Sequence, residues 1–133
     1  MNEPLSSIMT RDVITADQED SVATARHIFL KNKVHHLPIV DGSRLVGILT
    51  TYDLFKLNGA AGKNYDEVRI GDVMTTHLAT LEPEDKIGSA AELFLENRFH
   101  AVPIVKDGDL KGIVTSFDVI KYEFRKEYPT QPV

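Results

Sequence analysis

The chain contains no cysteine among its 133 residues. This absence excludes a disulfide scaffold, a thiolate zinc site, an iron–sulfur cluster and a cysteine nucleophile, and it leaves the redox compartment undetermined. The sequence also lacks an apolar run long enough to span a bilayer, and it has no basic segment followed by an apolar leader. We therefore expect a cytoplasmic protein with no membrane partner.

Basic residues are fewer than acidic ones: the chain has 15 lysines and arginines and 20 aspartates and glutamates, which gives a formal net charge of −5. A negative total opposes general attraction to nucleic acid or to an anionic membrane, so neither is expected as a partner. A small anion can still bind where local geometry favours it. The remaining composition, 42% hydrophobic and 26% charged, is typical of a soluble domain that can build a core.

The sequence repeats itself. The stretch Gly47–Asp53 returns as Gly112–Asp118 at an offset of 65, and the two copies align without a gap from Ile8/Val73 to Leu54/Val119, with 18 of 47 paired positions identical. Two copies are too few for a solenoid, which needs at least three. Since a half of this size would be marginal alone, we expect one globule with a shared core and a pseudo-twofold axis.

Each copy begins with a predicted strand and helix. Val13–Thr15 is interpreted as a short strand, and Asp20 and Asp85 as the N-caps of two helices. The apolar residues of those helices have helical spacing and are interpreted as core: Val22, Ala25, Ile28 and Phe29, then Ile87, Ala90, Leu93 and Phe94. Asn32 and Asn97 are predicted to end the helices.

A hairpin and a second helix follow. Pro38 and Pro103 suit the first residue of a strand or a sheet edge, because proline has no N–H to donate. Gly and Asp at 41–44 and 106–109 predict tight turns, which join each proline strand to the strand ending in Thr50 or Thr115. The last helix is predicted over about 116–126. The fold class is therefore α+β, with two β-α-β-β-α repeats.

The predicted boundaries follow the repeat. Residues 1–7 are interpreted as a lead-in, 8–58 as the first repeat, 59–72 as a linker, 73–126 as the second repeat and 127–133 as a tail. The segment 58–64 is rich in glycine and polar residues and is expected to be flexible.

The motif Gly-x-x-Thr-x-x-Asp occurs in both copies where a strand is expected to enter a helix. Free backbone N–H groups collect there, so an anionic or sugar-bearing ligand could be held. A carboxylate offers two acceptor oxygens for adjacent sugar hydroxyls, and glycine would let the backbone approach the ligand. Thr-x-x-Asp is also close to a capping box, and both roles can coexist in one carboxylate.

The histidines do not favour a metal site. His35 and His36 are adjacent, so in an extended segment their side chains point to opposite faces. No His-Glu-x-x-His or phosphate-loop pattern occurs, and no nucleophile, base and orienting group can be assembled. We therefore expect neither a metal site nor an enzyme, with a small phosphohydrolase as the least favoured reading.

These motifs resemble a known family, the tandem cystathionine-β-synthase-type (CBS) domain pair, also called a Bateman module. The resemblance depends on the repeated Gly-x-x-Thr-x-x-Asp, on His-His-Leu-Pro and His-Ala-Val-Pro, and on the Met-Thr that opens each copy. It covers residues from Ile8 to about Tyr122, and it implies that the two repeats are intertwined. It implies a regulatory module, not a catalyst, that binds adenosine-containing nucleotides (AMP, ADP or ATP) in two clefts and signals to a partner.

The resemblance also implies the site residues, which it places in two sets. One cleft would hold Ile48, Thr50, Asp53, Thr80, His100 and Ala101, and the other would hold Ile113, Thr115, Asp118, Thr15, His35 and His36. It further implies energy sensing, a homodimer formed through the helices of both copies, and an unidentified effector protein. No cofactor is expected to be required, and whether Mg²⁺ accompanies ATP is left open.

Two departures qualify these expectations. Many relatives carry a basic residue after the first histidine of His-x-x-Pro, where this sequence has His36 and Ala101, so we expect the Asp118 cleft to hold phosphates better than the Asp53 cleft. Tyr52 and Phe117 stand where some relatives have a small hydroxyl residue. The alternatives are a protein–protein adaptor with vestigial clefts, and a sensor of S-adenosylmethionine or a dinucleotide.

Overall fold

The computed structural model describes residues 1–57, 64–97 and 100–129. The predicted flexible link over 58–64 falls outside this range except for Asn64. The chain forms two compact units, one made of residues 14–78 and the other of residues 1–13 together with 79–133. Each unit is described by itself below.

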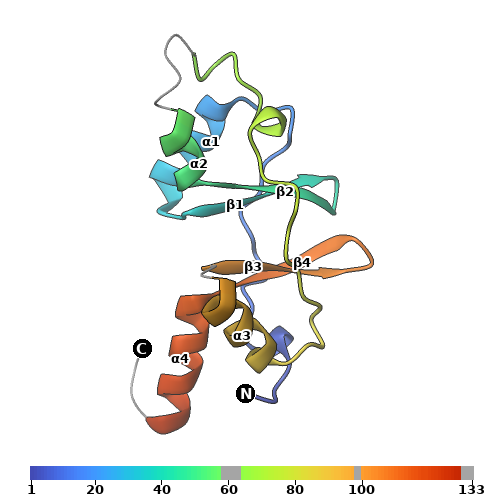
Figure 1. Ribbon diagram of the computed structural model, residues 1–133, viewed down its shortest axis with the longest axis vertical. Helices are drawn as coiled ribbons and strands as arrows, with labels where there is room; N and C mark the ends of the chain where they lie inside the picture. The colour runs from blue at the N-terminus through green and yellow to red at the C-terminus, as the bar shows by residue number, and fades with distance from the viewer. Residues whose placement is uncertain (58–63, 98–99, 130–133) are drawn as a thin grey trace. The chain divides into compact units, whose positions relative to one another are not determined.

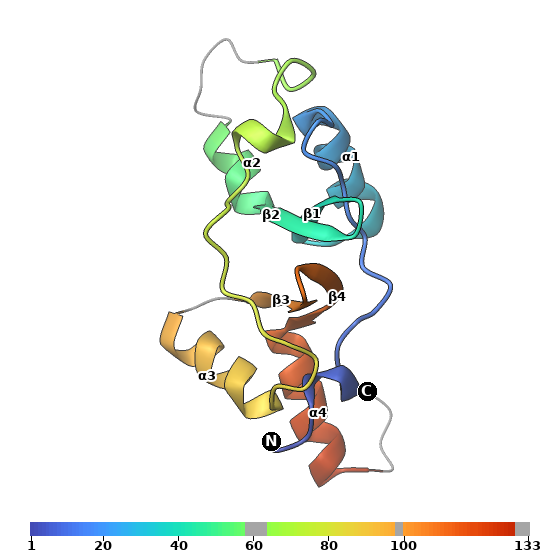
Figure 2. The ribbon, with the colours of Figure 1, turned by 90° about the vertical axis from the view of Figure 1, so that its right-hand side faces the viewer.

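The unit of residues 14–78 is a hairpin covered by two helices. Along the chain it contains α1 (Val22–Asn32), β1 (His36–Asp41), β2 (Arg44–Thr50), α2 (Thr51–Leu57) and a 3₁₀ turn, η2 (Ile70–Asp72). Both helices lie on the same face of the β1–β2 hairpin (Figures 1 and 2). The second unit repeats this pattern with α3 (Ile87–Asn97), β3 (Ala101–Lys106), β4 (Asp109–Thr115), α4 (Ser116–Glu127) and η1 (Leu5–Ser7). The predicted α+β class and the predicted last helix are confirmed.

The two hairpins have the same register. Pro38 faces Ile48 in the first, Pro103 faces Ile113 in the second, and each hairpin shifts register once, after Ile39 or Ile104. Asp107 and Gly108 both have positive φ, 53° and 87°, as a type I′ turn requires, whereas the first loop places Gly42 at φ 64°. The predicted tight turns are confirmed.

Each unit has its own hydrophobic cluster between hairpin and helices. In the first, Leu37, Ile39 and Leu49 pack against α1 residues such as Val22 and Phe29. In the second, Val102, Ile104 and Val114 pack against Ile87 and Ala90 of α3. Strand side chains alternate in direction, so Pro38 and Ile48 lie on the opposite face of the first hairpin.

The segment that opens each copy in the sequence packs against the hairpin of the other copy. Thr10 exchanges two backbone hydrogen bonds with Ile113, of 2.9 and 3.0 Å, and Thr75 exchanges two of 2.9 Å with Ile48. Leu5 of η1 and Ile70 of η2 are fully buried in the same two units. The repeats are therefore intertwined within the chain, as predicted, because each unit takes its opening segment from the other repeat.

The first predicted strand is wrong. Val13–Thr15 forms no strand. Only the next residue, Ala16, forms a single parallel bridge with Ile39: Ala16 N donates to Pro38 O, and Val40 N donates to Ala16 O. The bridge ends there because the chain turns at once toward α1. Leu81 forms the same bridge with Ile104 in the second unit.

Two smaller predictions also need correction. Ser21, not Asp20, caps α1, and its hydroxyl accepts a hydrogen bond from Thr24 N at 3.1 Å. The carboxylates of Asp20 and Asp85 instead accept from Asp17 N and Glu82 N, which closes the turn before each helix. Both helices end at the predicted asparagines, although the left-handed residue after α1 is Lys33, at φ 55°.

The prolines lie at the third residue of β1 and β3, not the first. Proline is tolerated there because Pro38 and Ile48 face each other as a pair without hydrogen bonds between them. The N–H and C=O of Ile48 instead bond to Thr75, so no N–H is needed from Pro38. The missing N–H therefore falls at the outer edge of β1, as the edge prediction required.

Candidate functional site

Both Gly-x-x-Thr-x-x-Asp motifs form capping boxes at the starts of helices α2 and α4. Thr50 N donates to Asp53 Oδ2 at 2.9 Å, and Asp53 N donates to Thr50 Oγ1 at 3.1 Å. Thr115 N donates to Asp118 Oδ2 at 2.8 Å, and Asp118 N donates to Thr115 Oγ1 at 3.2 Å. The structural reading of the motif is therefore correct in both copies. The capping box uses Oδ2 of each aspartate and leaves Oδ1 for another role.

The two aspartates differ in their surroundings. Asp53 is 7% exposed and is the one buried charged side chain among the described residues. Its Oδ1 lies 3.5 Å from Lys56 Nζ, one turn further along α2. Asp118 is half-buried, and within the described part of the chain its Oδ1 has neither a hydrogen bond nor an ion pair. Asp118 is thus the aspartate better placed to accept hydrogen bonds from a ligand.

The repeated glycines of the motif, Gly47 and Gly112, serve packing, not ligand approach. A Cβ on Gly112 would lie 2.7 Å from Thr10 O and 2.8 Å from Met9 Sδ. A Cβ on Gly47 would lie 2.5 Å from Met74 Sδ and 3.1 Å from Thr75 O. The expectation that these glycines make room for a ligand is therefore wrong, because the Met-Thr segment already fills that space.

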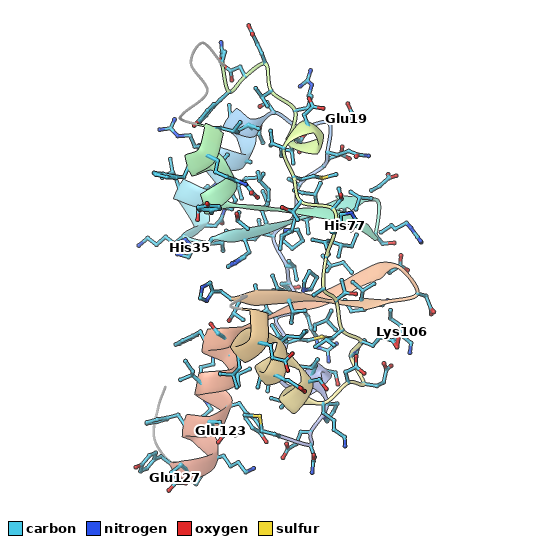
Figure 3. The ribbon with its side chains drawn as sticks, in the orientation of Figure 1. Glu19, His35, His77, Lys106, Glu123 and Glu127 are labelled. Atoms are coloured by element: carbon cyan, nitrogen blue, oxygen red, sulfur yellow. The ribbon has the colours of Figure 1, made fainter. Side chains whose placement is uncertain are left out.

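The His-x-x-Pro segments meet the motif of their own copy. His35 O accepts a hydrogen bond from Thr51 N at 3.1 Å, and His100 O accepts one from Ser116 N at 2.9 Å. Both histidine side chains are exposed, and His35 lies just before the start of β1 (Figure 3). A backbone contact that the sequence did not suggest therefore ties each histidine to the first residue of α2 or α4.

The predicted site residues divide evenly between the units. Six lie in the unit of residues 14–78: Thr15, His35, His36, Ile48, Thr50 and Asp53. Six lie in the other unit: Thr80, His100, Ala101, Ile113, Thr115 and Asp118. Within each unit the structure brings the capping box, the preceding isoleucine and the His-x-x-Pro segment to the same end of the hairpin, because His36 pairs with Thr50 and Ala101 with Thr115.

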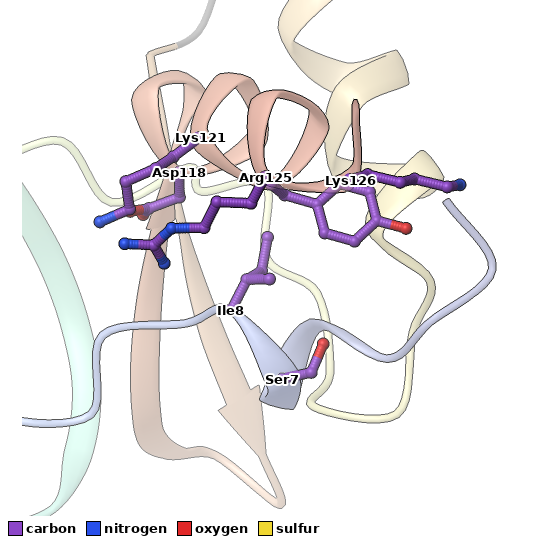
Figure 4. A pocket seen from close by; sticks show the side chains of 7 residues that line it. Ser7, Ile8, Asp118, Lys121, Arg125 and Lys126 are labelled. Atoms are coloured by element: carbon purple, nitrogen blue, oxygen red, sulfur yellow. The ribbon is translucent and has the colours of Figure 1, made fainter. Parts of the chain in front are cut away.

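A cavity of about 360 Å³ opens beside Asp118 in the second unit. Its walls are the turn residues Ser7 and Ile8 and a stripe of α4: Asp118, Lys121, Tyr122, Arg125 and Lys126. Figure 4 shows the ends of Asp118, Lys121 and Arg125 gathered at one end of the pocket, whereas Lys126 points away from them. The sequence interpretation missed these three cations. Their spacing from Asp118 along one helix could have indicated them.

A second, more open cavity of about 460 Å³ lies in the unit of residues 14–78, lined by Arg26, Thr51, Leu54, Phe55 and Tyr65. Residues 1–57, 64–97 and 100–129 contain no cluster of three or more side chains able to hold a metal ion. In the same ranges no helix has the length and apolar character needed to cross a membrane.

Comparison with known proteins agrees with the repeat. A family model for the CBS domain matches residues 5–59 and 70–125. An uncharacterized protein of Methanocaldococcus jannaschii, MJ1225, is 32% identical over 132 residues, a match that covers 91% of this chain and 47% of that protein. The chain spans between about a quarter and a half of the first curated relatives that it matches.

Two solved structures with similar folds contain adenosine compounds. CBSX2 in complex with AMP superimposes with a TM-score of 0.83 at 29% identity, covering 94% of this chain and 98% of that one. The CBS domain pair of protein MJ0100, in complex with 5′-methylthioadenosine and S-adenosyl-L-methionine, gives a TM-score of 0.83 at 30% identity and covers 95% and 99%.

Proposed function

Because this chain belongs to the CBS domain family, we propose that it is a regulatory module that binds an adenosine-containing ligand and signals its presence to another protein. The observation that carries the proposal is the uncommitted Oδ1 of Asp118, beside the pocket on α4. A charged acceptor of this kind suits the adjacent 2′ and 3′ hydroxyls of a ribose. The adenosine compounds bound by CBSX2 and by the MJ0100 domain pair support this ligand class.

AMP, ADP and ATP are the ligands we favour, and Ile113 and Thr115 are assigned to the same ligand as Asp118. We also propose Thr15, His35 and His36, which lie in the unit of residues 14–78, as ligand-binding residues. The same role is proposed for Asp53, Thr50 and Ile48 in that unit, and for Thr80, His100 and Ala101 in the other. Since Asp53 is already paired with Lys56, we expect the ligand at Asp53 to bind more weakly.

The signal in this proposal is a shift in population. A nucleotide changes the partner's response only if it binds one arrangement of the protein better than another. The cellular role we propose is energy sensing in the cytoplasm, read out by an effector protein. No catalytic step is assigned to these residues.

We also propose a homodimer formed through the helices. Matched helix positions of the two copies expose large apolar side chains: Leu30 and Leu95 are 70% and 85% exposed, Tyr52 and Phe117 are 65% and 61%, and Phe55 and Ile120 are 71% and 66%. Exposed apolar groups that recur at the same positions are typical of an interaction surface. Sedimentation at micromolar concentration should show a dimer, and the double variant Phe55→Asp/Ile120→Asp should be monomeric.

Calorimetric titration tests the ligand class. Adenosine, AMP, ATP, 5′-methylthioadenosine and S-adenosylmethionine are titrated separately into the purified protein, after mass spectrometry has identified any compound that copurifies. The proposal predicts saturable binding of at least one of them, weakened in Asp118→Ala more than in Asp53→Ala. Binding of none of the five, with a folded protein, would refute the function. Equal losses in the two variants would refute the difference between the aspartates.

A further inference from the structure

The pocket beside Asp118 is lined by three positive charges and one negative charge, although the whole chain is acidic. Lys121 and Arg125 lie one helical turn apart on α4 and face the same end of the pocket as Asp118 (Figure 4). Like charges at this spacing destabilise a helix slightly. Among the residues described, neither cation has an acidic partner: Lys121 Nζ lies 5.5 Å from the centroid of the Phe117 ring, and no ion pair reaches Arg125.

The third cation belongs to a different group of charges. Tyr122 and Glu3 raise the pKa of Lys126, and Tyr122 donates a hydrogen bond to Glu3. Lys126 also lies 5.7 Å above the ring of Tyr122. The excess positive charge available to a ligand in the pocket therefore comes from Lys121 and Arg125.

The first copy has no equivalent pair. Lys56 is the counterpart of Lys121, but it is bound to Asp53 at 3.5 Å. The counterpart of Arg125 at the offset of 65 is Ala60. The cationic stripe is thus a specific feature of the second copy and not a consequence of the duplicated fold.

We propose that Lys121 and Arg125 form a subsite for linked phosphate groups, so that the pocket at Asp118 selects a nucleoside di- or triphosphate over an uncharged adenosine compound. The inference rests on the proposed function in that Asp118 is taken to hold the ribose. Guanidinium is planar and matches phosphate oxygens with two parallel hydrogen bonds, and a lysine one turn away adds a second charge. The cavity volume lies at the lower end of the range for small-molecule pockets, about 300–1,000 Å³.

The test compares ligands that share either the adenosine or the phosphates. Adenosine, AMP, ATP and sodium tripolyphosphate are titrated by calorimetry into the wild type and into Arg125→Gln, Lys121→Gln and the double variant, in EDTA so that no divalent cation masks the phosphates. Arg125→Lys keeps the charge but loses the paired donors. Lys31→Gln, on an exposed turn of α1, is the matched control for loss of one positive charge.

The wild type should bind ATP more tightly than adenosine. The double variant should lose at least about tenfold in ATP affinity, the equivalent of one charge-assisted hydrogen bond, and keep adenosine affinity within about twofold. Arg125→Lys should fall between the wild type and Arg125→Gln, and Lys31→Gln should match the wild type. The preference for ATP over adenosine should shrink as salt is raised. Unchanged melting temperatures would confirm that the variants are folded.

Failure of this inference can be told apart from failure of the proposed function. If adenosine binds but ATP binds no better, or if ATP affinity survives in the double variant, the phosphate subsite is refuted and the adenosine function stands. If tripolyphosphate binds and is lost in the double variant while no adenosine compound binds, the subsite stands for free oligophosphate and the nucleotide function is refuted. If none of the four binds, both are refuted.

Discussion

The substitution Gly112→Ala tests the exchange of opening segments between the two repeats. The new methyl group would lie 2.7 Å from Thr10 O, 2.8 Å from Met9 Sδ and 2.9 Å from Met9 Cγ. Met9 is buried, at 8% exposed, and the Thr10 backbone is held to Ile113 by two hydrogen bonds. Met9 and Thr10 therefore cannot move away from the new methyl group without losing packing or hydrogen bonds.

The expected cost follows from these contacts. Overpacking a well-filled site costs typically about 1–3 kcal/mol. Displacing Thr10 would also weaken two hydrogen bonds, worth about 0.5–1.5 kcal/mol each. We expect Gly112→Ala to lower the free energy of unfolding by about 2–4 kcal/mol on these combined grounds. Gly47→Ala should cost less, about 1–2 kcal/mol, because its closest contact is the flexible end of Met74 and the nearest backbone atom, Thr75 O, is 3.1 Å away.

Urea unfolding and amide hydrogen exchange measure the two consequences. Gly112→Ala should speed exchange at the amides of Thr10 and Ile113 and leave those of Ile48 and Thr75 unchanged, and Gly47→Ala should do the reverse. Gly88→Ala, within α3, is the control. Its Cβ would make only ordinary contacts, with Met1 at 3.4 Å or more, and alanine is favoured in a helix. A cost below about 0.5 kcal/mol for Gly112→Ala, far under the usual overpacking range, would refute the packing of Met9 and Thr10 against β4.

Three further predictions concern the helix starts and α4. Thr115→Val removes the N-cap hydroxyl of α4 and should cost about 0.5–2 kcal/mol in urea unfolding, and a neutral result would contradict the capping box. Asp118→Asn keeps an oxygen for the Thr115 N–H but loses the charged acceptor, so AMP affinity should fall about 10- to 150-fold. Its loss of stability should be smaller than that of Asp118→Ala. Equal stability losses in the two variants would contradict the view that capping and ligand binding use different oxygens of Asp118. The hydrogen bond from Tyr122 lowers the pKa of Glu3 to about 2, so this contact is complete above pH 4.5 and is lost as the pH falls toward 2. In Tyr122→Phe the NMR titration midpoint of Glu3 should rise toward 4.5, and an unchanged midpoint would show that another group holds the carboxylate.

The duplicated sequence predicted the hairpins and helices because local patterns determine them. Apolar residues at helical spacing lie in the cores of both units, and Gly42 and Asp107–Gly108 make the two-residue turns that their composition requires. The capping boxes were also predictable, since Thr and Asp three residues apart satisfy free N–H groups within one turn of helix.

Long-range packing could not be predicted from these patterns. Leu5 and Ile70 are equivalent residues at the offset of 65. Nothing in their local sequence shows that Leu5 is buried in the unit of β3 and β4, or that Ile70 is buried in the unit of β1 and β2. The function of Gly112 was misjudged for the same reason, because the group that fills the space beside it, Met9, is distant in the sequence. The spacing of Arg125 from Asp118 on α4 is local, but the pocket beside them could not be predicted because its other wall, Ser7 and Ile8, comes from the other end of the chain.

The central claim is that Asp118 serves a ligand with one oxygen while it caps α4 with the other. NMR titration of the ¹⁵N-labelled protein with AMP tests it most directly. We predict saturable shifts of the amides of Ile113, Thr115 and Asp118 in the wild type, and loss of those shifts in a folded Asp118→Asn variant. Absence of saturable shifts at these amides, or the same shifts at the same AMP concentrations in Asp118→Asn, would contradict the claim.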